Sequence, residues 1–229
     1  MKRLVFDIET AGEKFARLDK EQKQYLTRFA HDEKELLTAK QSTSFYPVTG
    51  IVVAIGMFSP DYPGSGKVYY INPDSQEQIK DEKQQVILEP FANEKDLLER
   101  FWQAVANFDQ VITFNGRGFD VPFLMIRSAI NQVKITADLM GYRYDKAKSR
   151  HVDLADQLSF YGVTKKVSLD MFCKAFGIKS PKSGGVTGLQ VPALFYKKKY
   201  VEIAKYCYGD VVATHELYTY WRNYIALEK

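Results

Sequence analysis

Short apolar runs, separated by polar and turn-rich segments, predict the strands of a sheet. Four such runs (KRLVFDI, IVVAIGMF, KVYYIN and QVITF) are rich in β-branched or aromatic residues, as buried strands are. They occupy residues 2–8, 51–58, 67–72 and 110–114. The segment SPDYPGSG between the second and third runs predicts a hairpin connection. Residues 73–92 are polar and ambiguous, with a short edge strand expected at 85–90.

Apolar residues at helical spacing predict helices between and after these strands. From Glu94 onward, the spacing of Leu97, Leu98, Phe101 and Val105 is typical of one helix. We also expect a strand running into a helix at 151–160 and one or two surface helices within 12–40. Further helices are expected at 119–131, at 167–177 where Gly177 ends the helix, and at 199–226. Because no repeat or linker divides the chain, the sequence predicts one α/β domain over residues 1–229.

Composition and charge narrow the class of protein. The 229 residues are 45% hydrophobic and 26% charged, as in ordinary globular proteins. Since the N-terminus lacks the pattern of a signal peptide and no apolar run reaches about 20 residues, we expect a soluble, cytoplasmic protein that does not bind membranes. The two cysteines are too few for a disulfide framework or a zinc site.

The positive charge is concentrated in the later part of the chain. Residues 140–205 carry 13 Lys and Arg against 5 Asp and Glu, although the net charge of the whole chain is only +4. A local basic field suits a polyanionic partner such as nucleic acid. A lysine-rich solvated surface is the other interpretation, and charge alone favours it.

Acidic residues stand inside three of the apolar segments. Asp7 and Glu9 are two apart on a strand, so both side chains point to one face, where they repel unless a cation lies between them. Asp120 follows a buried strand and the turn NGRG, and it begins a helix; the helix dipole alone would also favour an acid there. Tyr206 and Asp210 share one apolar helix face, where an unpaired carboxylate is costly. Together the three segments favour a metal-binding site over three independent structural explanations.

These segments resemble the motifs of the DEDD superfamily of 3′–5′ exonucleases, which share a ribonuclease H-like fold. Asp7 and Glu9 match the first motif, D-x-E. The second, N-G-x(2–5)-F-D-x-P-[FY]-L, is matched by Asn115, Gly116, Phe119, Asp120, Pro122, Phe123 and Leu124. Tyr206 and Asp210 match the third, Y-x(3)-D. Since Lys205 stands where the sister subgroup has a histidine, the chain resembles the tyrosine (DEDDy) subgroup, and within it the stand-alone bacterial relatives of the family-B DNA polymerase proofreading domain.

The resemblance implies hydrolysis with two divalent metal ions, Mg²⁺ or Mn²⁺, at a central mixed β-sheet flanked by helices. Asp7, Glu9, Asp120 and Asp210 would hold the ions, and Tyr206 would position the attacking water. The expected substrate-binding residues are Thr10, Asn115, Phe119, Lys179 and Lys182. Asp153 is a candidate either for orienting the metal-binding residues without binding metal itself or for a structural role. His151 is expected to be structural.

The expected function is therefore a 3′–5′ exonuclease that releases nucleoside 5′-monophosphates from single-stranded DNA. The alternatives are a 3′–5′ exoribonuclease, because sugar discrimination depends on pocket contacts, or an inactive nucleic-acid-binding module on the same fold. A protein partner is possible but unidentified from the sequence. No polymerase module fits in the remaining chain, so we expect no proofreading in cis. Residues 11–46 are an insertion that the resemblance does not cover, and we expect it to cap one edge of the site.

Overall fold

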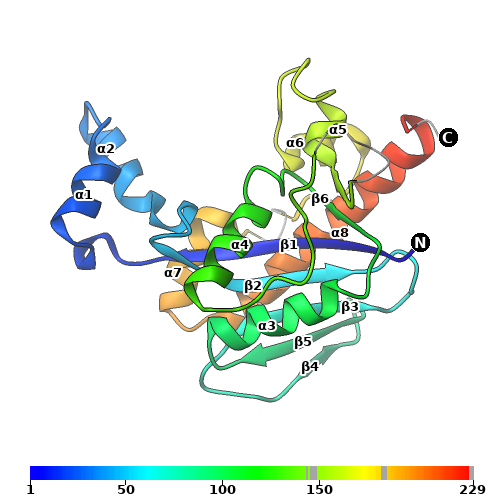
Figure 1. Cartoon of the computed structure of the whole chain (residues 1–229), viewed down its shortest axis with the longest axis horizontal. Helices are drawn as coiled ribbons and strands as arrows, with labels where there is room; N and C mark the ends of the chain where they lie inside the picture. The colour runs from blue at the N-terminus through cyan, green and yellow to red at the C-terminus, as the bar shows by residue number, and fades with distance from the viewer. Residues whose placement is uncertain (143, 145–148, 182–184, 227–229) are drawn as a thin grey trace.

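A mixed β-sheet forms the centre of the protein, seen in a computed structural model that describes residues 1–142, 144, 149–181 and 185–226 (Figure 1). Within these residues the sheet has seven strands in the order β4-β5-β3-β2-β1-β6-β7. The strands are β1 (Arg3–Gly12), β2 (Gly50–Phe58), β3 (Gly66–Ile71), β4 (Ile79–Asp81), β5 (Val86–Phe91), β6 (Gln110–Thr113) and β7 (His151–Asp153). The expected α/β fold with a central mixed sheet is confirmed.

Both parallel and antiparallel pairs occur in this sheet. Strands β1, β2 and β3 are antiparallel neighbours, whereas β1, β6 and β7 run parallel. Among the described residues, β6 pairs with β1 only along Arg3–Val5. The second half of β1, which carries Asp7 and Glu9, therefore extends past the end of β6 and leaves room for a site beside it.

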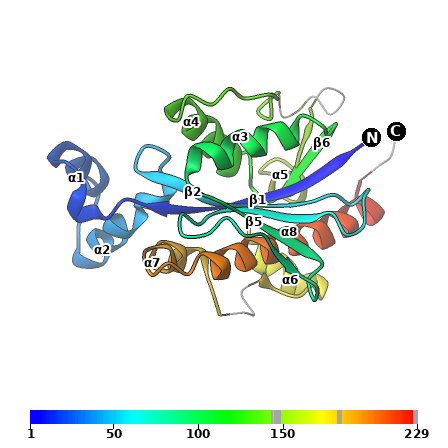
Figure 2. The ribbon, with the colours of Figure 1, turned by 90° about the horizontal axis from the view of Figure 1, so that it is seen from below.

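Helices cover both faces of the sheet (Figure 2). One face carries α3 (Glu94–Val105) and α4 (Asp120–Ile130), and the other carries α6 (Leu169–Phe176), α7 (Val191–Tyr196) and α8 (Tyr200–Tyr224). The short α5 (Leu154–Leu158) directly follows β7. At Gly56 of β2, an added Cβ would lie 2.7 Å from Val211 Cγ2, so only glycine allows α8 to pack this closely on the sheet.

An arm of residues 13–49 leaves the end of β1 and returns at the start of β2. It consists of α1 (Lys20–Thr27), α2 (Glu33–Gln41) and the short turns η1 (Phe15–Arg17) and η2 (Ser42–Phe45), and neither α1 nor α2 contains a buried residue. Hydrogen bonds fix its root, from the Tyr196 hydroxyl to the Gly12 carbonyl (2.9 Å) and from the Arg127 guanidinium to the Pro47 carbonyl (3.0 Å). The expected surface helices in this segment are confirmed.

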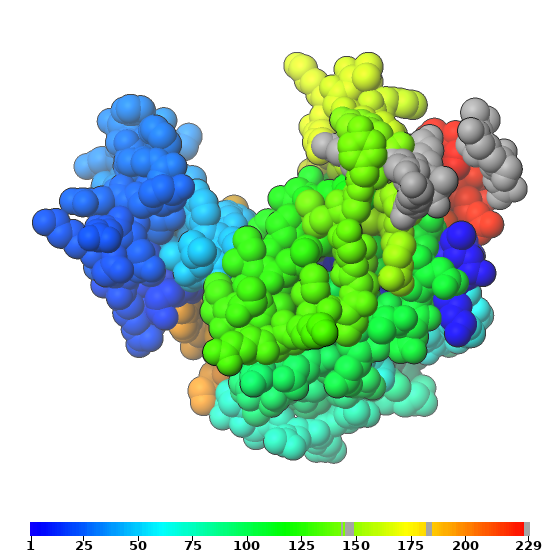
Figure 3. Space-filling model, in the orientation of Figure 1, coloured from blue at the N-terminus to red at the C-terminus, as the bar shows by residue number. Residues whose placement is uncertain are grey.

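A hollow separates the arm from the segments that follow β7 (Figure 3). In the space-filling view the blue arm and the yellow segments stand on either side of it, and the green atoms of α4 lie at its base. The arm is therefore placed as one wall of an open groove. Whether it caps substrate remains a prediction.

The remaining elements follow the predictions with three exceptions. The first strand continues to Gly12, beyond the predicted end at residue 8, because its pairing with β2 extends as far as Gly12 and Gly50. The strand expected at 85–90 is present as β5, but it is not at the edge of the sheet, because β5 lies between β3 and the edge strand β4. Helix α7 was not predicted. In the described residues, no helix has both the length and the apolar character to cross a membrane.

Candidate active site

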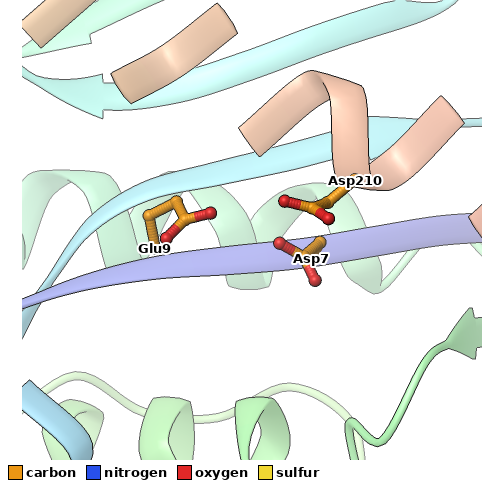
Figure 4. Close-up of side chains that lie close together, drawn as sticks. All are labelled: Asp7, Glu9 and Asp210. Atoms are coloured by element: carbon orange, nitrogen blue, oxygen red, sulfur yellow. The ribbon is translucent and has the colours of Figure 1, made fainter. Parts of the chain in front are cut away.

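Three carboxylates converge at the middle of β1 (Figure 4). Asp7 and Glu9 come from this strand, and Asp210 reaches them from α8. One ligand oxygen from each side chain lies within 4.8 Å of the others. The two-residue spacing on the strand thus places Asp7 and Glu9 on one face, as predicted, and the helix packed above that face supplies the third acid.

Asp120 approaches the same strand from α4, which lies on the opposite face of the sheet from α8 (Figure 2). It is the first residue of α4 and only 4% exposed. Its Oδ1 accepts a hydrogen bond from the backbone N–H of Ile8 at 3.0 Å, the residue between Asp7 and Glu9. The sheet and two helices therefore bring all four acids of the predicted set around one stretch of β1.

Burial, together with the charges of neighbouring acids, raises the pKa values of Asp7, Glu9 and Asp120. Burial is the main cause for Asp7 and Glu9, whose pKa values lie well above the usual range, and the neighbouring carboxylates add to it. For Asp120, burial raises the pKa to about 7 although the Ile8 N–H favours its charged form. Full ionisation of this cluster needs positive charge nearby. Closely spaced carboxylate oxygens are the donors that Mg²⁺ and Mn²⁺ prefer, so the residues fit a divalent metal site.

Tyr206 lies one helical turn before Asp210 on α8, so the two side chains share one face of the helix. Burial, followed by the charges of Asp210 and Glu9, raises the pKa of Tyr206 far above its usual value. The phenol therefore stays protonated at neutral pH. It can act as a hydrogen-bond donor but not as a general base.

The turn that leads into α4 is held by Asp153 at the end of β7. The carboxylate of Asp153 accepts three backbone N–H bonds, from Asn115 (2.8 Å), Arg117 (2.9 Å) and Ala155 (3.0 Å). Asn115 has a φ of +61°, a conformation that asparagine tolerates better than most residues. Asp153 thus positions the turn that carries Asn115, Phe119 and Asp120, and its charge adds to the rise in the pKa of Asp120.

His151 supports the same turn from inside the sheet. Its Nδ1 lies 3.0 Å from the Leu139 carbonyl oxygen, so this nitrogen carries the proton, and Nε2 accepts from the Thr113 hydroxyl at 2.7 Å. The Thr113 oxygen in turn accepts from the Gly116 N–H at 3.1 Å. Burial lowers the pKa of His151 to about 4, so the ring is neutral in this network. These contacts agree with the structural role expected for His151.

A cavity of about 410 Å³ opens beside the acids. Asp7 and Asp120 line it together with Asn115 and Phe119, so these two predicted substrate-binding residues share one space with the acids. Lys166 also lines it and lies 3.2 Å from Asp156. The cavity is therefore lined by two acids, one amide, two aromatic residues (Phe114 and Phe119) and one cation.

The other predicted substrate-binding residues lie elsewhere. Thr10 is buried, and its hydroxyl donates to the Ser44 carbonyl at 2.8 Å, so it fixes the root of the arm. Lys179 lines a separate cavity of about 750 Å³, which Tyr206 also borders. Lys182 lies outside the described residues. Lys205, at the position of the histidine in the sister subgroup, forms an ion pair with Asp81 at 2.9 Å.

One residue beside the cavity was not predicted from the sequence. Phe45, in η2 of the arm, places its ring 6.3 Å from that of Phe119 and is 47% exposed. The segment around Phe45 has neither a regular spacing of apolar residues nor a recognised motif, so nothing in the sequence linked Phe45 to the site.

Comparisons with known proteins find similarity to an exonuclease family and to a DNA polymerase. Residues 70–226 match a family model described as a predicted 3′–5′ exonuclease related to the exonuclease domain of PolB. A DNA polymerase 1 of Sulfurisphaera ohwakuensis is 37% identical over 75 residues, which are 31% of this chain and 9% of that protein.

The fold has a counterpart among solved structures. The family B DNA polymerase of the hyperthermophilic archaeon Pyrobaculum calidifontis matches 97% of this chain with a TM-score of 0.62 and 18% identity. The chain spans 24% of that polymerase's length. The likeness confirms the expected ribonuclease H-like fold.

Proposed function

Because the chain belongs to the family of predicted 3′–5′ exonucleases related to the exonuclease domain of PolB, we propose that it hydrolyses the 3′-terminal phosphodiester bond of single-stranded DNA and releases nucleoside 5′-monophosphates. The convergence of Asp7, Glu9 and Asp210 within 4.8 Å carries this proposal. Asp120 completes the set through its contact with Ile8. We assign the activity to one domain of residues 1–229, acting in the cytoplasm and with any protein partner still to be identified.

The four acids would hold two divalent ions, Mg²⁺ or Mn²⁺. When bound, these ions would activate water and neutralise charge on the leaving oxygen. The protein's own part is to keep the carboxylates close and buried, which the packing of α4 and α8 against β1 accomplishes. The raised pKa values of Asp7, Glu9 and Asp120 mean that the ion-free site holds protons, and metal binding would release them.

The remaining residues would orient the substrate and water. Tyr206 has a phenol that stays protonated, so it would donate a hydrogen bond to the attacking water and position it without removing its proton. Asn115 and Phe119 line the cavity beside Asp7, where they would contact the terminal nucleotide by a hydrogen bond and by stacking. Lys166 would offer its cation to a phosphate. We keep Lys179 and Lys182 as candidates for contacts with the strand farther from the cut.

Digestion of end-labelled substrates tests the proposal. Matched 5′-labelled single-stranded DNA and RNA would be incubated with Mg²⁺, Mn²⁺ or EDTA, with wild-type protein, Asp7→Ala and the control Glu77→Ala, an exposed acid near the opposite edge of the sheet. We expect a ladder that shortens from the 3′ end only with metal, absent for Asp7→Ala and unchanged for Glu77→Ala. Faster loss of RNA would move the assignment to an exoribonuclease. Intact DNA and RNA with a folded wild-type protein that binds Mn²⁺ would refute hydrolysis and favour a binding module.

A further inference from the structure

The arm brings an aromatic side chain into contact with a residue that lines the catalytic cavity. Phe45 belongs to η2, and its ring centroid lies 6.3 Å from that of Phe119, which lines the cavity with Asp7 and Asp120. Phe45 is 47% exposed, although it sits among packed elements. An exposed aromatic ring next to a buried polar site is a typical feature of ligand contact.

The position of Phe45 is fixed by the strand that carries the acids. Thr10, directly after Glu9, donates its hydroxyl to the carbonyl of Ser44, directly before Phe45, at 2.8 Å. At Gly12, an added Cβ would lie 2.3 Å from the backbone nitrogen of Ser44, so the backbone of η2 packs directly on β1. Phe45 is therefore held in a set place relative to Glu9, even though the rest of the arm projects into solvent.

The angle between the two rings decides how they can bind bases. The planes of Phe45 and Phe119 meet at 69°, an edge-to-face arrangement, so the rings cannot enclose one flat base between them. Phe119 is also in contact with Phe123, at 5.4 Å between centroids. Each of Phe45 and Phe119 can thus offer a face to a different base. The 6.3 Å between them suits neighbouring nucleotides of an unstacked strand.

We propose that Phe45 stacks on the penultimate nucleobase of the single strand while Phe119 contacts the terminal one. This rests on the proposed function, because it assigns a substrate position at the same site. Phe45 would thereby fix the direction in which the strand leaves the cavity, toward the hollow between the arm and the segments after β7 (Figure 3). It is a positioning residue from a segment that the family model does not cover.

A binding cycle with abasic strands tests the assignment. Binding of 5′-fluorescein single-stranded DNA would be followed by anisotropy in EDTA, with strands that are intact, abasic at the penultimate position or abasic at the terminal position. Stacking on an aromatic side chain changes affinity by about 5- to 150-fold per base. We expect wild-type protein to bind the penultimate-abasic strand weaker by a factor in that range. Phe45→Ala should bind the intact strand weaker by a similar factor and no longer respond to loss of the penultimate base.

Three further comparisons make the result specific. Phe45→Ala should still respond to loss of the terminal base, because Phe119 is unchanged. Phe45→Leu keeps an apolar contact with Phe119 but has no ring face, so it should melt like wild type and bind like Phe45→Ala, whereas Phe45→Trp should restore discrimination. Phe29→Ala, in the α1–α2 turn and 72% exposed, is the matched control and should bind like wild type.

The outcomes separate the two proposals. If wild-type protein cleaves and distinguishes the strands but Phe45→Ala or Phe45→Leu does so equally well, the role of Phe45 is refuted and the exonuclease proposal stands. Additive effects of Phe45→Ala and the penultimate abasic site would also refute it. If wild-type protein neither binds nor cleaves any strand, the exonuclease proposal fails first.

Discussion

Asp153→Asn should loosen the turn that carries Asn115 and Asp120. The carboxylate of Asp153 accepts N–H bonds from Asn115 and Ala155 on Oδ1 and from Arg117 on Oδ2. An asparagine has the same shape but only one acceptor oxygen. In either amide orientation, its NH₂ group faces at least one backbone N–H, so one donor meets another donor.

The size of the effect follows from these contacts. A hydrogen bond to a charged group contributes about 1.5–3 kcal/mol, and the two remaining bonds become weaker when the charge is lost. Burial raises the pKa of Asp153, so removing the charge also relieves part of its desolvation. We expect the free energy of unfolding to fall by about 2–4 kcal/mol, which lowers Tm by roughly 4–16 °C in a chain of this size.

Urea unfolding and steady-state kinetics on single-stranded DNA would measure both consequences. A displacement of about 1 Å in a catalytic group lowers turnover by up to about 100-fold. The kcat of Asp153→Asn should therefore be reduced even under conditions in which the variant is still folded. Asp138→Asn is the matched control, since Asp138 is exposed and accepts one backbone N–H, from Met140 at 2.8 Å. It should change stability by no more than about 0.5 kcal/mol. An Asp153→Asn protein with wild-type stability and kcat would contradict the positioning role.

Three other outcomes are expected. Tyr206→Phe should lower kcat by about 100-fold, within the range for a lost transition-state donor, with little change in KM; equal turnover would show that the hydroxyl is dispensable. Replacing residues 19–41 of the arm by a short glycine-serine linker should leave cleavage of very short strands intact and raise KM for long ones, and an equal KM for all lengths would refute the cap. His151 has a folded pKa of about 4 against 6.5 for an ordinary histidine, so the unfolded chain binds more protons between these values and stability falls as pH decreases through this window. The free energy of unfolding should drop by about 2 kcal/mol from about pH 7.5 to about pH 5, and His151→Gln should remove this part of the slope.

Much of the fold could be predicted from the sequence because burying one face of a helix or strand requires apolar residues at a regular spacing along the chain. The spacing of Leu97, Leu98 and Phe101 marks α3, and all three are fully buried. Strand β4, by contrast, has only three residues, and two of them are exposed, so it carries no apolar pattern. Its place at the edge is decided by pairing with β5, which local sequence does not encode.

The candidate site was predictable to the extent that it depends on a motif. The spacing of Asp7 and Glu9 and that of Tyr206 and Asp210 follow from strand and helix geometry, and the structure brings these residues together. The burial of Thr10 against Ser44 depends on how the arm folds back, which spacing along the chain cannot show. Phe45 was missed for the same reason.

The root of the arm also has a consequence for how this protein could diversify. Gly12 and Gly50 are paired neighbours on β1 and β2, so the arm begins and ends at adjacent points of the sheet. A segment whose ends are already side by side can change length at a small entropic penalty, about 0.6 kcal/mol for each doubling. Arms of other sequences could therefore be grafted between these two glycines while the four acids stay in place. The sheet would then serve as a constant support for the four acids, and the arm as an exchangeable part beside them.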